Sequence, residues 1–222
     1  MNKAKSLKDK LIKAASDDNA FAAAEALAAG ADPNCDAEGW TPLRHAAAVN
    51  GIETINELVK AGADVNKSNA EGSALTWAVF YDNIDAVNAL IGFGANVNIR
   101  EDDNWTPLHW TSLHDRADIA YALIKAGANI NARNAEGNTP LSIACQKSRR
   151  RVVALLLSSG ADVNIASERG WTALDHAQAY MDRKDEGKDK ELAELCVQTL
   201  IKHGAHWGKL KARDDRVQLK GD

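Results

Sequence analysis

The sequence predicts an all-α solenoid in which helix-turn-helix repeats are joined by β-hairpin-like loops. Two separate markers with one period support this prediction. A segment of the Thr-Pro-Leu type recurs with its leucine at Leu43, Leu75, Leu108, Leu141 and Leu174, at spacings of 32, 33, 33 and 33 residues. A Gly-Ala pair recurs at Gly30, Gly62, Gly94, Gly127 and Gly160, at spacings of 32, 32, 33 and 33 residues, and again 44 residues later at Gly204. A period of this length indicates a stack of small units, each of which contacts its neighbours.

The fullest copy of the first marker, Thr106-Pro107-Leu108-His109, resembles the opening of the ankyrin repeat. The resemblance covers roughly residues 20 to 206. It implies a non-catalytic protein that binds another protein or a peptide through a concave surface of hairpin tips and first helices. It also implies that His109 has a structural role, in which it bonds backbone groups in the turns of its own and the adjacent repeat.

The repeat spacing sets the expected domain boundaries. We expect N-terminal capping helices over residues 1–35 and four repeats over 36–68, 69–101, 102–134 and 135–168. A C-terminal capping repeat follows over 169–208, and a tail over 209–222. The final spacing of 44 residues exceeds the period by 11, which corresponds to a charged insertion at 181–191. A longer helix pair and a solvated loop both fit this insertion.

The N-terminal segment has apolar residues at helical spacing, Leu7, Leu11, Ile12 and Ala15, among five lysines between residues 3 and 13. This pattern predicts a short amphipathic helix. A polar cap that covers the end of the stack is one interpretation, and a membrane-surface or targeting helix is the other.

Each repeat then begins with a hydroxyl residue that caps a helix by accepting a backbone N–H. These residues are Thr41, Ser73, Thr106, Thr139 and Thr172. In three repeats a proline follows at the first helical position, where a missing N–H costs nothing: Pro42, Pro107 and Pro140. The second helices have one apolar face, such as Ile52, Ile55, Leu58 and Val59, and a glycine after each suits the left-handed residue that ends a helix.

Two further features concern the turns. By the resemblance, the asparagines at 66, 98, 131 and 164 brace the hairpin between one repeat and the next. The cluster Arg149–Arg151 places Arg150 where earlier repeats have Ile52 and Ile84, so we expect this helix pair to start late or to splay. The cluster fits a solvated rim or a patch that attracts an anionic partner.

Composition restricts the class of function. The formal net charge is −4, whereas a duplex-binding protein would carry a basic stripe, so nucleic acid is not the expected partner. The three cysteines, at 35, 145 and 196, have no metal-type spacing, which favours a reducing compartment. With no signal-peptide pattern and no run near the ~20 apolar residues that span a bilayer, we expect a cytoplasmic protein. Later export by a route without a cleavable signal stays open.

Few residues suggest chemistry. Cys145 lies where the first repeat has Ala47, a small buried position, and a nucleophilic cysteine would need a base such as His109 within hydrogen-bonding reach. His203, His206 and Cys196 offer three ligands, whereas structural zinc takes four. We therefore expect no enzyme, no metal and no cofactor. An enzyme with an unrecognised Cys/His site is the alternative.

The aromatic residues indicate the binding surface. Trp40, Trp105 and Trp171 each precede the capping threonine, at the hairpin tip. The candidate partner-binding residues are Trp40, Phe80, Tyr81, Trp105, Leu113, His114, Lys147, Trp171 and Tyr180. Tryptophans that pack tip against tip and stiffen the hairpins are one interpretation, and tryptophans that anchor an interface are the other. We expect a monomer with a protein partner, and an effector or toxin-neutralising protein of the bacterial type is the special case.

Overall fold

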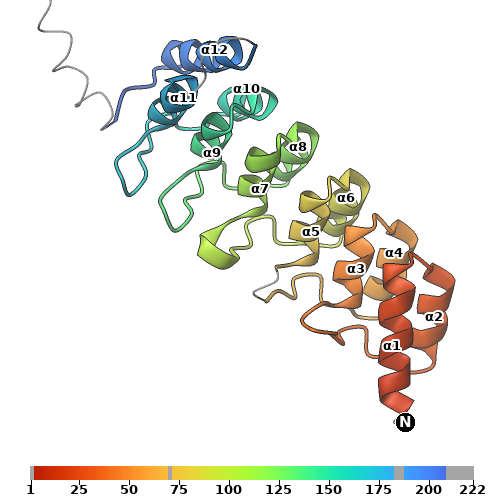
Figure 1. Ribbon diagram of the computed structural model, residues 1–222. Coiled ribbons are helices and arrows are strands. Elements are labelled where there is room, and N and C mark those ends of the chain that lie inside the picture. Colours follow the sequence, from red (N-terminus) through yellow and green to blue (C-terminus); the bar gives the residue numbers. More distant parts are fainter. Residues whose placement is uncertain (1–2, 70–71, 183–187, 209–222) are drawn as a thin grey trace, which may run out of the picture. The chain divides into compact units, whose positions relative to one another are not determined.

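A computed structural model of the chain describes residues 3–69, 72–182 and 188–208, and in these residues the regular structure is helical (Figure 1). The first six helices are α1 (Lys3–Ser16), α2 (Ala20–Ala28), α3 (Pro42–Ala48), α4 (Ile52–Lys60), α5 (Ala74–Phe80) and α6 (Ile84–Gly92). A short 3-10 turn, η1 (Asp102–Asn104), precedes α7 (Pro107–His114), α8 (Ala117–Lys125), α9 (Pro140–Gln146), α10 (Arg150–Ser158), α11 (Ala173–Asp182) and α12 (Lys188–Lys202). The predicted all-α repeat architecture is confirmed.

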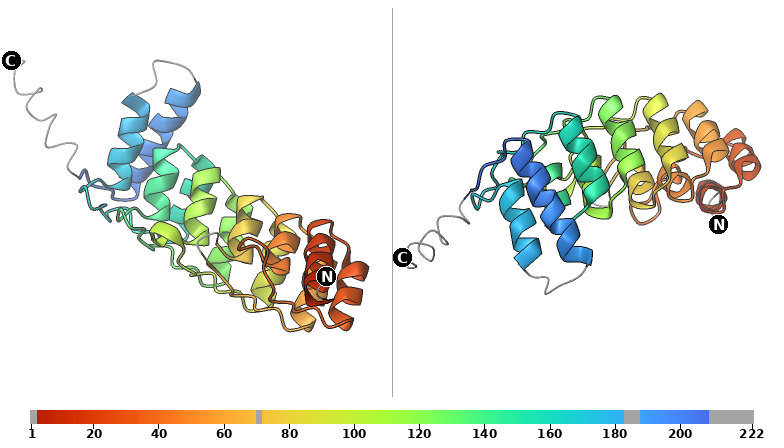
Figure 2. Two further views of the ribbon diagram at one scale, coloured as in Figure 1. Left: turned by 60° about the horizontal axis from the view of Figure 1, so that its bottom comes forward. Right: turned by 90° about the horizontal axis from the view of Figure 1, so that it is seen from above.

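The chain divides into two compact units, Met1–Asp102 and Asp103–Asp222. Each unit is built of two layers of helices (Figure 2). In the first unit, α1, α3 and α5 pack side by side as one layer, and α2, α4 and α6 form the other. In the second unit, α7, α9 and α11 form one layer, and α8, α10 and α12 the other. Below, "first helices" and "second helices" mean these two layers.

Each first helix contains one leucine of the repeated series, and this leucine is part of the buried core. Leu43, Leu75, Leu108, Leu141 and Leu174 are exposed by no more than 2%. Each leucine lies one residue after the first helical position, and its side chain is buried in the packed core. Replacing such a leucine by alanine costs about 2–5 kcal/mol of stability.

The predicted side-chain caps of the first helices are confirmed at Thr41, Ser73 and Thr139. The hydroxyl oxygens of Thr41, Ser73 and Thr139 each accept the backbone N–H three residues later, at 3.2 Å. The Asn104 that replaces a glycine in the third repeat has a φ of 58°, so it adopts the left-handed conformation that its neighbours reach with glycine. These contacts explain why the helices start where the sequence places them.

Asparagines join successive repeats at the ends of the second helices, as predicted. Asn66 donates to the carbonyl oxygen of Gly94 at 3.3 Å and accepts the N–H of Asn96 at 2.7 Å. Asn164 makes the matching pair with Gly204 and His206. One side chain therefore satisfies both the carbonyl that ends a helix and the amide that begins the next hairpin.

A second ladder joins the repeats at the turns between the paired helices. Asn50 has a φ of 59°, and its Oδ1 accepts the N–H of Ala86 in the first turn of α6 at 3.0 Å. Asp115, with a φ of 61°, accepts the N–H of Val152 in the first turn of α10 at 3.4 Å. The residues at the N-caps of α4, α6, α8 and α10 make no side-chain capping bond of their own. In α6 and α10 the preceding repeat therefore supplies the cap.

The last repeat differs from the others. The charged insertion at 181–191 lies partly in residues 183–187, which are outside the described residues, and the tail at 209–222 lies outside them as well. The expected late start of the helix at the arginine cluster is wrong, because α10 begins at Arg150, 33 residues after α8 begins at Ala117. Arg149 preserves the turn, since its Nε donates to the carbonyl oxygen of Leu113 at 3.0 Å.

Candidate functional site

Trp40 is held at the hairpin tip of the first unit. Its backbone forms an isolated antiparallel bridge with Ala37, with both N–H···O distances at 2.9 Å. The half-buried indole ring packs on His45 at a centroid distance of 5.0 Å and on Trp77 at 4.5 Å. Trp40 therefore packs against its own first helix and the first helix of the next repeat.

Arg44 fixes the two hairpins on which this packing depends. Its side chain is buried, with 1% exposed, and it donates to the carbonyl oxygen of Gly39 at 2.6 Å. It also donates to Oδ1 of Asn69 at 2.7 Å and to the carbonyl oxygen of Gly72. The guanidinium carbon lies 5.6 Å from the centroid of the Trp40 ring, at cation–π distance.

The aromatic ledge consists of Trp40, Trp77, Phe80 and Tyr81. Phe80, the last residue of α5, and Tyr81, which follows it, lie three and four residues after Trp77, so the three rings meet at the end of the helix. Centroid distances are 5.5 Å for Trp77–Phe80, 5.7 Å for Trp77–Tyr81 and 5.3 Å for Phe80–Tyr81. Phe80 is 39% exposed and Tyr81 50% exposed. Trp40 and Trp77 thus form the packed base of the ledge, and the rings of Phe80 and Tyr81 are open to solvent.

The other predicted site residues lie in the second unit. The Trp105 ring packs on His109 at 5.7 Å and on Trp110 at 4.9 Å, and Trp110 stacks parallel to His114 at 6.1 Å. Leu113 and Tyr180 are half-buried and Lys147 is exposed.

Trp171 repeats the arrangement of the other two tip tryptophans. It packs on His176 at 5.2 Å, five residues on, as Trp40 packs on His45 and Trp105 on Trp110. The rings of all three tip tryptophans therefore rest on their own first helices.

Two histidines beside these tryptophans are perturbed by their surroundings. Burial lowers the pKa of His45, and the charge of Arg44 lowers it further. Burial likewise lowers the pKa of His114, with Arg116 and Arg149 adding to the effect. Both imidazoles are consequently favoured in the neutral form, in which they stack as apolar rings.

The ledge includes a residue that the sequence interpretation left out of the site. Trp77 is not among the predicted site residues, yet its ring contacts those of Trp40, Phe80 and Tyr81. Its spacing from Phe80 and Tyr81 was the signal that could have found it. Val49, which is 45% exposed at the end of α3, was also left out of the candidate site.

His109 has the structural role implied by the resemblance. Its Nδ1 accepts the N–H of Thr106 at 3.1 Å, which leaves Nε2 to donate to the carbonyl oxygen of Asn138 at 3.1 Å. The ring is fully buried. His109 therefore joins its own turn to the hairpin of the next repeat.

Cys145 and His109 do not form a nucleophilic pair. Cys145 is 1% exposed, and burial, followed by the neighbouring Cys196, raises the pKa of its thiol well above the usual value. A nucleophilic cysteine needs the opposite, a lowered pKa and an accessible sulfur. His109 already bonds through both nitrogens.

The arginine cluster divides into different roles. Arg149 caps the end of α7 through Leu113, and Arg151 forms an exposed ion pair with Asp118 at 3.1 Å. Arg150 lines a groove of about 430 Å³ between α10 and α12, together with Leu195 and other residues of both helices. Surface pairs such as Arg151–Asp118 contribute little to stability.

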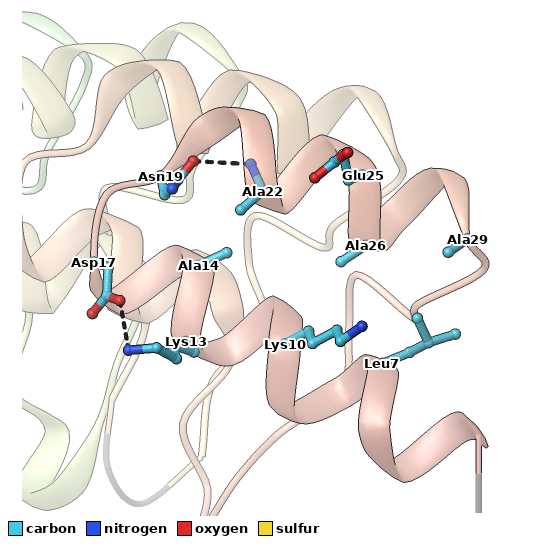
Figure 3. A pocket seen from close by; sticks show the side chains of 10 residues that line it. All are labelled: Leu7, Lys10, Lys13, Ala14, Asp17, Asn19, Ala22, Glu25, Ala26 and Ala29. Carbon is cyan, nitrogen blue, oxygen red and sulfur yellow. Dashed lines mark hydrogen bonds and ion pairs between the residues drawn. The ribbon is translucent and has the colours of Figure 1, made fainter.

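Two further grooves lie within single units. One, of about 510 Å³, runs between α1 and α2, where Ala14 and Ala26 point into the space between the helices and Lys10 lies beside it (Figure 3). The other, of about 420 Å³, lies beside Trp171 and His176 in the second unit. The described residues contain no group of three His, Cys, Asp or Glu side chains that could hold a metal ion. Within the same residues, no helix combines the length and apolarity needed to cross a membrane.

Comparison with models of known protein families identifies the family of the chain. The model of a family described as ankyrin repeats (3 copies) matches residues 6–69 and 75–167. The match begins inside α1, so it includes the first helix pair. No curated protein matches the chain.

Proposed function

Because the chain belongs to the ankyrin repeat family, we propose that it is a non-catalytic protein-binding module that holds its partner on the aromatic ledge of the first unit. Ankyrin repeats generally mediate protein–protein interaction, so a protein or peptide is the expected class of partner. Binding would act by occupancy, in which the partner is masked, tethered or presented without covalent change.

The observation that supports this proposal is the pair of open rings, Phe80 and Tyr81, on the base formed by Trp77 and Trp40. Aromatic residues dominate the energy of protein interfaces because they bury a large area at a small cost in conformational entropy. A ring already held by its neighbours loses less freedom when a partner binds. The proposal also includes contributors outside the ledge. These are the predicted site residues of the second unit: Trp105, Leu113, His114, Lys147, Trp171 and Tyr180.

The catalytic alternative has less support. Its nucleophile would be Cys145 and its base His109. The thiol of Cys145 is buried and has a raised pKa, and both ring nitrogens of His109 already make hydrogen bonds. We therefore propose no reaction for the chain.

Affinity capture with matched variants tests the proposal. The immobilised wild-type protein is compared with a Phe80→Ala/Tyr81→Ala variant and with a control, Phe93→Ala/Tyr121→Ala. The control removes two rings of similar exposure, 41% and 53%, at the end of α6 and on α8.

A protein from the source cell that binds the wild type and the control, and is lost with the ledge variant, supports the proposal. Equal retention by all three would move the site away from the ledge. Thermal unfolding of each variant shows that the fold is kept.

A further inference from the structure

We infer that the partner presents apolar side chains bordered by lysine or arginine, because the aromatic ledge adjoins a row of carboxylates. This inference rests on the proposed function and adds the chemistry of the partner. The row, here called the acidic edge, consists of Asp17, Asp18, Glu53, Asp82 and Asp85.

The acidic edge follows the turns between first and second helices in the first unit. All five carboxylate residues are exposed, and residues 17–21, 49–53 and 81–85 contain no lysine or arginine. A lysine from α1, Lys13, pairs with Asp17 at 2.8 Å, with side chains 77% and 54% exposed. A pair this exposed is screened and does little to cancel the field of the row.

The ledge and the acidic edge meet at the same ends of the helices. Asp82 directly follows Tyr81, and Asp85 lies in the first turn of α6. Asn50 donates to a carboxylate oxygen of Asp85 at 3.4 Å, which brings that oxygen beside the end of α3. Val49, exposed by 45%, ends α3 at the position that Tyr81 occupies on α5. Apolar and acidic groups therefore alternate along this border.

The charge is a property of the first unit and not of the repeat. The corresponding turns of the second unit, residues 114–118 and 147–151, have Asp115 and Asp118 but also five basic residues. These are Arg116, Lys147, Arg149, Arg150 and Arg151. Turns of this geometry therefore accommodate acidic or basic side chains, and the turns beside the ledge carry acidic ones.

A partner with basic residues around its apolar contact would gain from this arrangement. Complementary charge at the rim of an interface raises the association rate and excludes partners of like charge. An acidic partner would instead bring carboxylates against Asp82 and Asp85.

Selection from a random 16-residue peptide library displayed on phage tests the inference. The whole protein is the bait, and peptides that also bind Phe80→Ala/Tyr81→Ala are removed. We expect the remaining peptides to have a mean net charge about two units above that of the unselected library.

A charge variant and a matched control complete the experiment. Asp82→Asn/Asp85→Asn should lower the association rate of a selected peptide about three- to tenfold at low salt, whereas Glu25→Gln/Glu57→Gln, with the same change in net charge, should not. Asparagine suits residue 82 because Asn50 has the same left-handed conformation one repeat earlier.

The possible failures are distinct. Ledge-dependent peptides without a positive bias would overturn the inference and leave the proposed function standing. No ledge-dependent peptide at all would count against both.

Discussion

Replacing Arg44 by alanine should destabilise the first unit strongly. The side chain is 1% exposed and makes three hydrogen bonds, to Gly39, Asn69 and Gly72, that join two successive hairpins. A hydrogen bond that involves a charged group contributes about 1.5–3 kcal/mol. Water can replace part of this at an exposed hairpin tip, so we expect a loss of about 3–4 kcal/mol rather than the full sum.

Urea unfolding of the whole chain measures this loss, and hydrogen exchange at the amides of Ala37 and Trp40 locates it. Arg151→Ala is the control, because it removes an exposed arginine that pairs with Asp118 and should cost about 0.5 kcal/mol or less. Arg44→His should recover part of the loss, since His109 at the same repeat position bonds the next hairpin through Asn138. A loss for Arg44→Ala as small as that for Arg151→Ala would refute the role given to Arg44.

Three other predictions follow from single contacts. Asp115→Ala should cost about 1–2 kcal/mol, because it removes the cap on Val152 and a residue suited to positive φ, whereas Asp115→Asn should be nearly neutral in urea unfolding. The pKa values of His45 and His114 are lowered in the folded protein, so the unfolded chain binds protons at these residues first as the pH falls. The contribution of the two histidines to the free energy of unfolding is therefore complete above pH 6.5, the usual pKa of histidine, and declines as the pH falls below it. His45→Gln/His114→Gln should flatten this slope in unfolding curves measured across that range, and an unchanged slope would contradict it. Titration with a thiol reagent should find Cys35 accessible in the native protein, and Cys145 and Cys196 only after denaturation, since Cys35 is half-buried whereas the other two thiols are buried.

The repeat architecture was predictable because each of its signals is local. A capping hydroxyl, a proline at the first helical position and a glycine after the second helix each specify a helix end within a few residues. The period then predicts that every leucine of the series occupies the same position within its own repeat. The expected ankyrin resemblance is confirmed over residues 6–69 and 75–167.

Contacts between repeats were harder to predict, because their partners lie far along the chain. The sequence gives no local sign that Asn50 caps Ala86, 36 residues later. Arg44 stands where the third repeat has a histidine, and its greater length lets it reach two hairpins instead of one. Arg149 looked like part of a charged patch, yet it takes the place of a polar turn residue such as Asn83, which caps the end of α3.

The ledge was predictable in part. Trp40, Phe80 and Tyr81 were chosen from the sequence, and the stacking of α3 on α5 brings them together. Trp77 is not among the residues predicted for the site. Only the structure shows that one ring can both pack on Trp40 and support Phe80 and Tyr81.

Site-specific photocrosslinking tests the central claim most directly. A photoreactive benzoyl-phenylalanine replaces Tyr81 in one sample and Tyr121 in another, since the two side chains are 50% and 53% exposed. After irradiation in an extract of the source cell, we predict a covalent adduct with a partner protein from position 81 and not from position 121. An adduct from position 121 alone would contradict the claim that the aromatic ledge binds the partner.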